Sequence, residues 1–568
     1  MKPASLGPAD RARAVRELAD QEFDVLVVGG GVVGAGAALD AVSRGLSVAL
    51  VEAADWAAGT SSRSSKLIHG GLRYLEQRDF HLVREALRER ALLLTRIAPH
   101  LVHPVPFLYP LKHRMWERFY VGAGIGLYDT MGGAGAVPRH RHLSHRHALR
   151  VAPALRGDAF VGAIQYFDAQ VDDARFTMTL ARTAAGYGAT VVTRAKAVGF
   201  LREADRVVGA RVHDLENDQE IQVRARHVIN ATGVWTDEAG RLANARGGPA
   251  VKASKGVHFL VPRDRIRLDT GLILRTEKSV LFVIPWGRHW IIGTTDTAWD
   301  LDKDEPAASQ ADVDYLLDHV NAVLRTPLSP DDIEAVYAGL RPLLSGGADD
   351  TAKLSREHSV AQPVPGLTVI AGGKFTTYRV MAEDAVDAAA ADLPTTVPSS
   401  VTGRVPLTGA VGYEVLWNER HRLARRSGLH VARIEHLLNR YGSCVHEILE
   451  LIERDPSLGE PITAARDYLK AEAVYAASHE GALHLEDVLR RRTRAAIEEW
   501  DQGTAAAPEI AGLIAPVLGW DDETVKRETD HYLRQVEAER RARREADDAA
   551  AAAARREVPG LFTERAAS

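Results

Sequence analysis

Side chains suited to binding an anion gather in a short stretch near the start of the chain. In SSKLIHGGLRYLE, residues 64–76, no carboxylate appears before Glu76. Guanidinium and ammonium groups are common protein ligands of phosphate, and tyrosine adds a hydroxyl donor. The stretch therefore predicts a site for a small, negatively charged group. Its candidate residues, most of them able to carry positive charge, are Lys66, His69, Arg73 and Tyr74.

Further cationic side chains lie far downstream, each beside a glycine or a predicted turn, where functional residues often occur. They are Arg341 in AGLRPLL, Arg356 in KLSREHS and Lys374 in GGKFTTYR. His258, in SKGVHFLVP, is of the residue type that most often acts as a general base near neutral pH. Arginines could instead lower the pKa of a substrate hydroxyl, so the sequence leaves the identity of the base open.

The elements that must position these residues begin with a nucleotide-binding unit. Residues 23–28 predict a buried parallel strand, and residues 46–51 predict a second strand that leads to Glu52. A G-x-G-x-x-G sequence between them opens a helix of small residues. Its glycines permit a tight turn, approach of a pyrophosphate and close helix packing, while the acid can bind a ribose hydroxyl. The glycines are Gly29, Gly31 and Gly34.

Composition excludes several classes of protein. The 568 residues exceed one compact core, so we expect two or three domains. The 71 lysines and arginines against 76 acids argue against bulk nucleic-acid binding. A single cysteine, Cys444, excludes a disulfide framework and a cysteine-based zinc or iron–sulfur site within the chain. The histidines of RHRHLSHRH, residues 139–147, predict no metal site, because acidic ligands are missing and the arginines repel cations.

No apolar leader segment and no run long enough to span a membrane is visible in the sequence. We therefore expect a cytoplasmic protein.

A second nucleotide-fold signal is HVINATG, residues 227–233, where an apolar strand leads into an Ala-Thr-Gly turn of the kind shared by FAD-dependent oxidoreductases. Other blocks stand around it in a fixed order. They are TSSRSSKLIHGGLRYLE (60–76), NATGVWT (230–236), VIPW (283–286), IIGTTD (291–296), AGLRPLL (338–344) and GGKFTTYR (372–379). Together they resemble FAD-dependent glycerol-3-phosphate dehydrogenase, the respiratory enzyme. The resemblance covers about residues 22–395 and continues more loosely into the C-terminal part.

The resemblance implies an α/β fold with a Rossmann-like FAD-binding domain of the glycine/D-amino-acid oxidase type, an inserted β-rich substrate domain and a C-terminal α-helical domain. The expected segments are 22–100 and 341–400 for the FAD-binding domain, 101–250 for a mixture of both, 251–340 for the substrate domain and 405–568 for the helical domain.

Two local patterns predict helices. Hydrophobic periodicity predicts a long helix over residues 73–99, ended by Pro104, Pro106 and Pro110. The alanine-rich residues 537–558 predict an exposed helix or a frayed tail.

The resemblance also implies roles for the cationic residues. In the family, the positions that match Arg73, Arg341 and Lys374 lie at the substrate site, and Arg356 matches a further arginine there. His258 matches a position near the substrate. Tyr74 could add a hydroxyl donor. The expected catalytic residues are His258, Arg341 and Lys374.

The loop of Ser64, Ser65 and Lys66 is placed against the flavin by the same resemblance, because hydroxyls and an ammonium suit the diphosphate, the flavin carbonyls or the ribityl chain. Gly71 leaves room for the flat ring, and His69 either lies beside the ring or packs in the core. The remaining predicted cofactor residues come from the downstream turns and are Ala231, Gly233, Gly373 and Thr376. Thr376 could instead cap a helix.

The implied reaction is oxidation of sn-glycerol 3-phosphate to dihydroxyacetone phosphate, with hydride transfer from C2 to N5 of FAD. In the family the electrons pass to a membrane quinone, in glycerol catabolism and respiration. Without a membrane span, contact with the inner face of the cell membrane requires a surface. Residues 107–127 interleave aromatic with basic side chains and form our hypothesis for it, although an ordinary buried helix and loop explains the same stretch.

Three rival interpretations stay open. A glycerol-3-phosphate oxidase would use oxygen and release peroxide with nearly the same substrate site. An amine or amino-acid oxidase shares the architecture but binds a carboxylate with one arginine. A flavin-binding protein without catalysis would use the helical part to dock partners. The oligomeric state is also open, a homodimer included.

Overall fold

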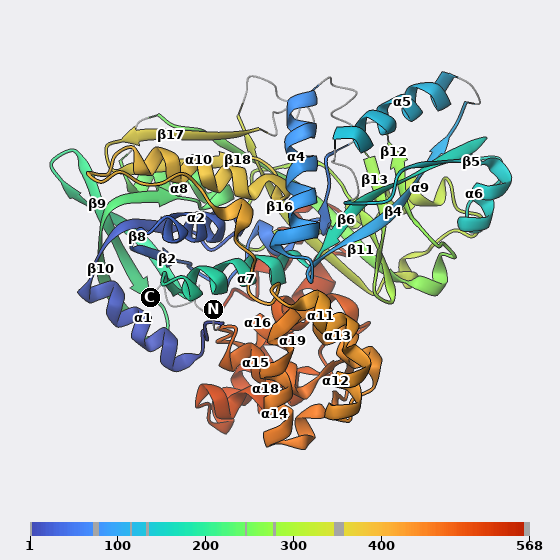
Figure 1. Cartoon of the computed structure of the whole chain (residues 1–568). Helices are drawn as coiled ribbons and strands as arrows, with labels where there is room; N and C mark the ends of the chain where they lie inside the picture. Colours follow the sequence, from blue (N-terminus) through green and yellow to red (C-terminus); the bar gives the residue numbers. More distant parts are fainter. Residues whose placement is uncertain are drawn as a thin grey trace.

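The computed structural model describes residues 3–71, 79–113, 116–131, 136–244, 247–276, 280–345 and 357–561. Two β-sheets stand side by side, and a group of helices from the C-terminal third packs beneath them (Figure 1). The expected α/β architecture with a helical C-terminal domain is confirmed.

The first sheet is built on the predicted nucleotide unit. Its order is β17 (His358–Val364), β18 (Leu367–Gly372), β10 (Gln219–Asn230), β1 (Glu22–Val28), β2 (Val48–Val51) and β7 (Thr190–Val192). The strands from β18 to β7 are parallel, whereas β17 is antiparallel, and β8 (Ala195–Glu203) and β9 (Arg206–Asp214) extend β10 as an antiparallel meander. The chain thus returns to this sheet after residue 357.

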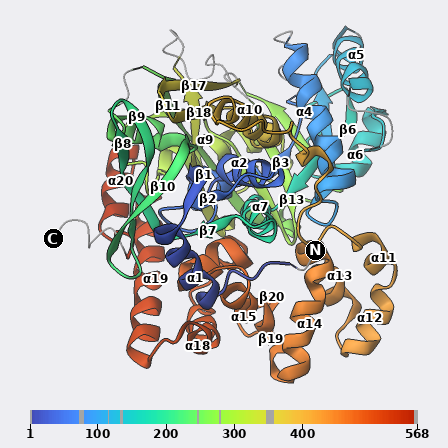
Figure 2. The ribbon, with the colours of Figure 1, turned by 60° about the vertical axis from the view of Figure 1, so that its left-hand side comes forward.

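The alternation of side chains in β1 explains how this sheet is covered. Val25 and Val27 face a core shared with α2 (Val32–Ser43), α7 (Asp173–Gly186) and α10 (Tyr378–Ala390). Leu26 and Val28 face the opposite core, which includes α1 (Pro8–Asp20) and β9. A parallel strand that is buried on both faces has a continuous run of apolar residues in its sequence, as β1 does. Figure 2 shows α2 and α10 side by side over the sheet.

Within the described residues, the second sheet contains ten strands drawn from distant parts of the chain. The main path is β15 (Thr297–Trp299), β11 (Val251–Pro262), β14 (His289–Gly293), β13 (Val280–Trp286), β12 (Gly271–Arg275), β4 (Val102–Leu111), β6 (Gly162–Val171) and β3 (Leu67–Ile68). β16 (Ala335–Leu344) pairs with β11, and β5 (Arg141–Ser144) pairs with β6. The sheet therefore combines residues 251–344 with strands that precede residue 172.

The long helix predicted over residues 73–99 needs correction. Asp79 caps α4 (Phe80–Leu92) by accepting a hydrogen bond from the Leu82 amide, and a π-helical turn, η2 (Leu93–Ile97), follows. The predicted terminating prolines instead lie inside β4. β4 pairs with β6 along its whole length, whereas its pairing with β12 covers Phe107 and Leu108. Among the described residues, the side of β4 that faces β12 is therefore mostly unpaired, so prolines elsewhere in the strand cost few ladder hydrogen bonds.

The hypothesis of a membrane-facing stretch over residues 107–127 is wrong for its first part. Phe107 and Leu108 are fully buried in the sheet. In α5 (Trp116–Met131), by contrast, Phe119, Tyr120 and Leu127 are 76%, 58% and 40% exposed. The covering helices of this half also include α6 (His145–Val151) and α9 (Gln310–Asn321), whereas α8 (Thr236–Leu242) packs against β8 and β18 of the first sheet.

The C-terminal domain is helical, as expected. Its longer helices are α12 (Arg420–Ser427), α13 (Val431–Tyr441), α14 (Val445–Arg454), α15 (Lys470–Ser478), α18 (Ala507–Leu518), α19 (Asp522–Ala542) and α20 (Asp548–Arg556). Cys444 is buried within it, and burial raises the pKa of its thiol to about 11. The prediction of an exposed or frayed segment near the C-terminus is wrong for α20, because Ala551 and Ala552 are buried and Asp548 pairs with the ammonium of Lys255 in β11.

Candidate active site and cofactor cavity

A cavity of about 1350 Å³ opens where the two sheets meet. Its wall includes the carboxyl ends of β1, β2 and β10, at Val28, Val51 and Ala231, together with His258 of β11 and Arg341 of β16. Ligands of open α/β sheets bind outside the carboxyl ends of the strands. The second sheet thus closes the nucleotide-binding edge of the first and brings the predicted substrate residues to it.

The glycine motif is shaped for close approach. Gly29 has φ +112°, and a β-carbon there would lie 2.6 Å from the carbonyl oxygen of Ala231. A β-carbon on Gly34 would lie 1.8 Å from the carbonyl oxygen of Gly29. Gly31 lines the cavity at the N-terminus of α2, where the helix dipole attracts an anion. The motif therefore fits the pyrophosphate of a dinucleotide.

Glu52 stands at the end of β2, where the sequence predicted a ribose ligand. It lines the cavity, and its carboxylate accepts hydrogen bonds from the amides of Gly30 at 2.5 Å and Ala54 at 2.7 Å. Burial raises the pKa of Glu52, and the two amide bonds oppose that shift. The same carboxylate thus braces the glycine turn.

Three turns from separate parts of the chain complete this end of the cavity. Ala231 and Gly233 come from the turn after β10, and Gly373 and Thr376 come from the turn before α10. The Thr376 hydroxyl accepts from the His69 amide at 3.1 Å and donates to the His69 carbonyl at 3.2 Å. His69 also lines the cavity, so the structure joins the loop after β3 to the returning FAD-domain segment.

Not every predicted cofactor residue lies in the wall. Among the described residues, the cavity lining omits Gly34, Lys66 and Gly71. Gly34 acts through helix packing, and Gly71 is buried with φ +75°. The Lys66 ammonium is fully buried and donates to Asp173 at 3.0 Å and to the Ser62 carbonyl at 3.1 Å. Lys66 therefore supports the loop from behind, while Ser64 and Ser65 reach the cavity.

His258, the predicted general base, lines the cavity. Its Nε2 lies 2.8 Å from the Ser65 hydroxyl, and its ring stacks on Tyr337 with centroids 4.9 Å apart. Its Nδ1 is buried and has no hydrogen-bond partner among the described residues. Burial, with smaller effects from Arg341 and Lys66, lowers the pKa of His258 well below its usual value. The neutral form of the imidazole is therefore favoured.

Arg341 and Lys374 bring positive charge to the same cavity from different segments. Arg341 projects from β16 and donates to the hydroxyl of Thr294 at 2.7 Å and the carbonyl of Thr295 at 3.1 Å. Lys374 follows the glycine pair that ends β18 and precedes a short 3-10 turn. Arg73, Tyr74 and Arg356 lie outside the described residues, so their predicted roles stay predictions.

Sequence reasoning missed two residues that organise this site. Asp173 accepts hydrogen bonds from the Ser64 amide at 2.9 Å and the Ser64 hydroxyl at 2.7 Å. Tyr337 donates its hydroxyl to the Ser64 carbonyl at 2.9 Å. Neither residue stands in a recognisable motif. The pair Asp172 and Asp173 is typical of the ordinary acidic start of a helix.

Comparison with known proteins identifies the family. The chain matches the family described as FAD dependent oxidoreductase over residues 24–387 and the C-terminal domain of alpha-glycerophosphate oxidase over residues 400–525. It is 58% identical over 556 residues to "Glycerol-3-phosphate dehydrogenase 2" of Mycobacterium tuberculosis (strain ATCC 25618 / H37Rv), covering 98% of this chain and 95% of the relative. It is 56% identical over 562 residues to "Glycerol-3-phosphate dehydrogenase" of Mycobacterium leprae (strain TN), covering 99% and 96%.

A solved structure agrees with these relatives. The glycerol-3-phosphate dehydrogenase of Bacillus halodurans complexed with FAD superposes with a TM-score of 0.77 and 29% sequence identity, covering 94% of this chain and 98% of that one.

Proposed function

Because the chain belongs to the FAD-dependent glycerol-3-phosphate dehydrogenases, we propose that it oxidises sn-glycerol 3-phosphate to dihydroxyacetone phosphate. The observation that carries the proposal is that the buried imidazole of His258 and the guanidinium of Arg341 line the same cavity. Such a pair supplies a proton acceptor and an anion ligand within one site. The relatives named glycerol-3-phosphate dehydrogenase align with nearly the full length of this chain, and their names support the same substrate.

Each charged or titratable residue of the cavity has a separate task. Arg341 and Lys374 bind the phosphate and orient the substrate, since guanidinium and ammonium groups form charge-assisted hydrogen bonds to phosphate oxygens. His258 accepts the proton of the C2 hydroxyl; its Nε2 contacts the Ser65 hydroxyl, and its Nδ1 is buried. FAD, when bound, supplies the two-electron acceptor.

The glycines and Glu52 are the proposed cofactor ligands at the pyrophosphate and ribose. Ser64, Ser65, His69, Ala231, Gly233, Gly373 and Thr376 surround the remaining part of the cavity.

Anaerobic flavin reduction tests this proposal directly. Purified holoenzyme should lose its flavin absorbance on addition of sn-glycerol 3-phosphate and keep it on addition of glycerol, which lacks the phosphate. Arg341→Ala should abolish rapid bleaching at substrate concentrations that saturate the parent enzyme. Protein that holds intact FAD but is not bleached by sn-glycerol 3-phosphate would overturn the assignment of substrate.

The proposed electron acceptor is a membrane quinone, reached from the inner face of the membrane. None of the described helices is long and apolar enough to cross a bilayer. Support comes from α5, where Phe119 and Tyr120 project large apolar surfaces into solvent, an arrangement typical of proteins that lie on a membrane. The homodimer stays a prediction.

Two measurements separate the acceptors and test the surface. Turnover with a soluble quinone analogue, without peroxide release in air, is expected of a dehydrogenase, whereas stoichiometric peroxide would favour the oxidase. The double variant Phe119→Ser, Tyr120→Ser should bind liposomes less than the parent. Trp500→Ser is the matched control, because Trp500 is 76% exposed on the C-terminal domain and should not affect binding. Equal loss in the control would remove α5 as the contact.

A further inference from the structure

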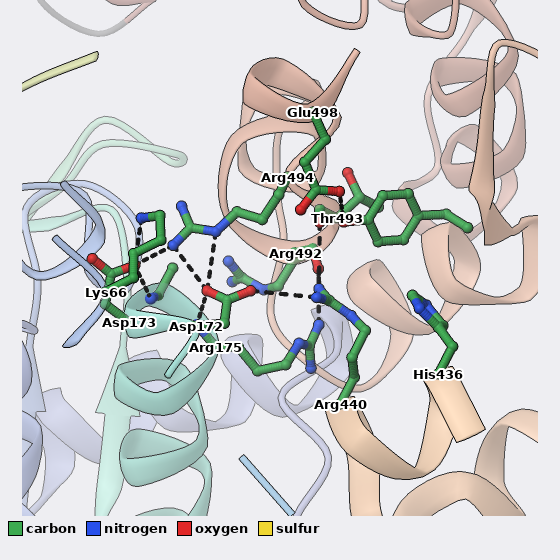
Figure 3. A network of polar contacts seen from close by, with 12 residues as sticks. Lys66, Asp172, Asp173, Arg175, His436, Arg440, Arg492, Thr493, Arg494 and Glu498 are labelled. Atoms are coloured by element: carbon green, nitrogen blue, oxygen red, sulfur yellow. Dashed lines mark hydrogen bonds and ion pairs between the residues drawn. The ribbon is translucent and has the colours of Figure 1, made fainter. Parts of the chain in front are cut away.

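The C-terminal domain reaches the loop before β3 through Arg494. This residue follows a π-helical turn, η11 (Val488–Thr493), and its side chain is 3% exposed. Its backbone has φ +91°, a conformation that residues other than glycine rarely adopt and that is retained where the surroundings require it. Figure 3 shows the side chain pointing out of the C-terminal helices toward Asp172 and Asp173 at the start of α7.

Arg494 binds both of these acids. Its Nη2 pairs with Asp173 and lies 2.8 Å from Asp172, and its Nε donates to Asp172 at 3.0 Å. Its Nη1 contacts the carbonyls of Arg490 at 3.0 Å and Ser62 at 3.4 Å. A planar guanidinium that is bound at every nitrogen fixes its partners in position as well as in charge.

Asp173 connects Arg494 to the loop of residues 64–66. Its carboxylate is fully buried and holds the amide and hydroxyl of Ser64 with one oxygen and the ammonium of Lys66 with the other. Arg494 adds a second cation on the Lys66 side. Both ends of the segment Ser64–Ser65–Lys66 are thus tied to a single carboxylate.

The middle of that segment meets His258. The Ser65 hydroxyl lies 2.8 Å from Nε2, and Tyr337 stacks on the imidazole while donating to the Ser64 carbonyl. The loop therefore contacts His258 directly through Ser65 and indirectly through Tyr337.

Charge balance makes Arg494 necessary in this arrangement. Burial raises the pKa of Asp172, but the guanidiniums of Arg494 and Arg440 outweigh it and hold the pKa far below its usual value. Burial lowers the pKa of Lys66, and Arg494 lowers it further, while Asp173 opposes both. Without Arg494, two buried carboxylates would share fewer cations, and the Lys66 ammonium would shift or a carboxylate would take up a proton. Either change moves Ser64.

We propose that Arg494 of the C-terminal domain is a positioning residue for substrate oxidation. It holds Asp173, which holds the Ser64–Ser65–Lys66 segment, and the segment orients His258 for proton transfer. This inference rests on the proposed function. It gives the C-terminal domain a part in the chemistry of the cavity.

The test uses rapid-reaction flavin reduction by sn-glycerol 3-phosphate in full-length holoenzymes. Arg494→Met should lower the limiting reduction rate about 10- to 100-fold, since displacement of a catalytic group by about 1 Å costs that much. The substrate concentration at half-saturation should change less than about 3-fold, because Arg341 and Lys374 stand on other segments. Arg494→Lys keeps the charge but loses the multiple contacts, so an intermediate rate is expected. All three side chains experience the same backbone strain at φ +91°.

Arg440→Met is the matched control. Arg440 donates to Asp172 at 3.4 Å and to the Arg492 carbonyl at 2.5 Å, but contacts none of residues 64–66 within the described chain. It should lose stability as the Arg494 variants do while keeping the parent's limiting rate. An equal fall in rate in this control would show that the contacts of Arg494 with Asp173 and Ser62 are not what sets the rate, and would overturn the inference.

A double-mutant cycle with Ser65→Ala isolates the route. If Arg494 acts through the loop, Arg494→Met should lower the rate far less in the Ser65→Ala background than in the parent. Full additivity of the two effects would overturn the inference. If Arg494→Met yields no folded holoenzyme, Arg494→Lys completes the same cycle. A parent enzyme that sn-glycerol 3-phosphate fails to bleach would refute the proposed function itself, and the inference with it.

Discussion

Replacing Gly34 by alanine should separate α2 from the turn that begins the proposed FAD site. A β-carbon at this position would lie 1.8 Å from the carbonyl oxygen of Gly29, whereas ordinary van der Waals contact begins at 3.4 Å. The obstructing atom belongs to the backbone, so no rotamer change relieves the contact. Helix or turn must therefore move by about 1.6 Å.

The cost follows from two opposing terms. Overpacking a close-packed interior costs about 1–3 kcal/mol, and contact with backbone places Gly34→Ala at the upper end of that range. Alanine gains about 1 kcal/mol over glycine within a helix. We expect a net loss of about 2 kcal/mol in the free energy of unfolding. Bound FAD should also be lost, because the same movement displaces the amides at the N-terminus of α2 from the pyrophosphate.

Two readouts check this expectation: the fraction of purified protein that carries FAD, and the thermal midpoint with and without added FAD. Gly512→Ala in α18 is the matched control, because its β-carbon would meet nothing within 4 Å. It should keep its FAD and gain about 0.5–1 kcal/mol. The reasoning is refuted if Gly34→Ala is as stable as the parent and retains its full complement of FAD.

Three further predictions concern charge. Arg341→Lys should raise the KM for sn-glycerol 3-phosphate at least about 10-fold, because an ammonium cannot reproduce the guanidinium fork; an unchanged KM in steady-state assays would contradict a phosphate role. At His484, burial lowers the pKa, but hydrogen bonds to Glu216 and Glu528 outweigh it and raise the pKa to about 9 from an ordinary value of 6.5. The stabilisation, up to about 3 kcal/mol, is fully present below pH 6.5 and lost as pH rises through about 9, so urea titrations should show His484→Gln differing from the parent at pH 6.5 and converging with it above pH 9. Asp548→Asn should weaken the pairing of α20 with Lys255 and expose the C-terminal helix to limited proteolysis; equal cleavage rates in variant and parent would argue against that role.

Much of this protein can be inferred from its amino-acid sequence. The nucleotide unit follows from local rules, because the glycine spacing, the apolar strands and Glu52 all lie within about thirty residues and each has a direct physical requirement. The order of the sequence blocks from residue 60 to 379 indicates the family, which the similarity to known dehydrogenases confirms. Predicted residues from β2, β11 and β16 do line one cavity.

Local patterns are insufficient where distant segments decide the structure. Residues 93–97 form a π-helical turn and the following prolines enter a strand, because pairing with β6 is decided by a segment about sixty residues away. Residues 551–552 look like a solvent-exposed alanine tract, yet they are buried against distant parts of the chain.

By itself, the sequence determined the chemistry that the chain can carry: a dinucleotide turn, a histidine and a set of cations. Only the tertiary structure decided which of these groups meet. Lys66, predicted beside the flavin, donates its ammonium to Asp173, which lies 107 positions along the chain, and Arg494 reaches the same carboxylate across 321 positions. Periodicity and motif spacing describe residues that are close along the chain. The partner of a buried charge is instead set by the packing of whole domains, because an unpaired ion in the interior costs too much free energy.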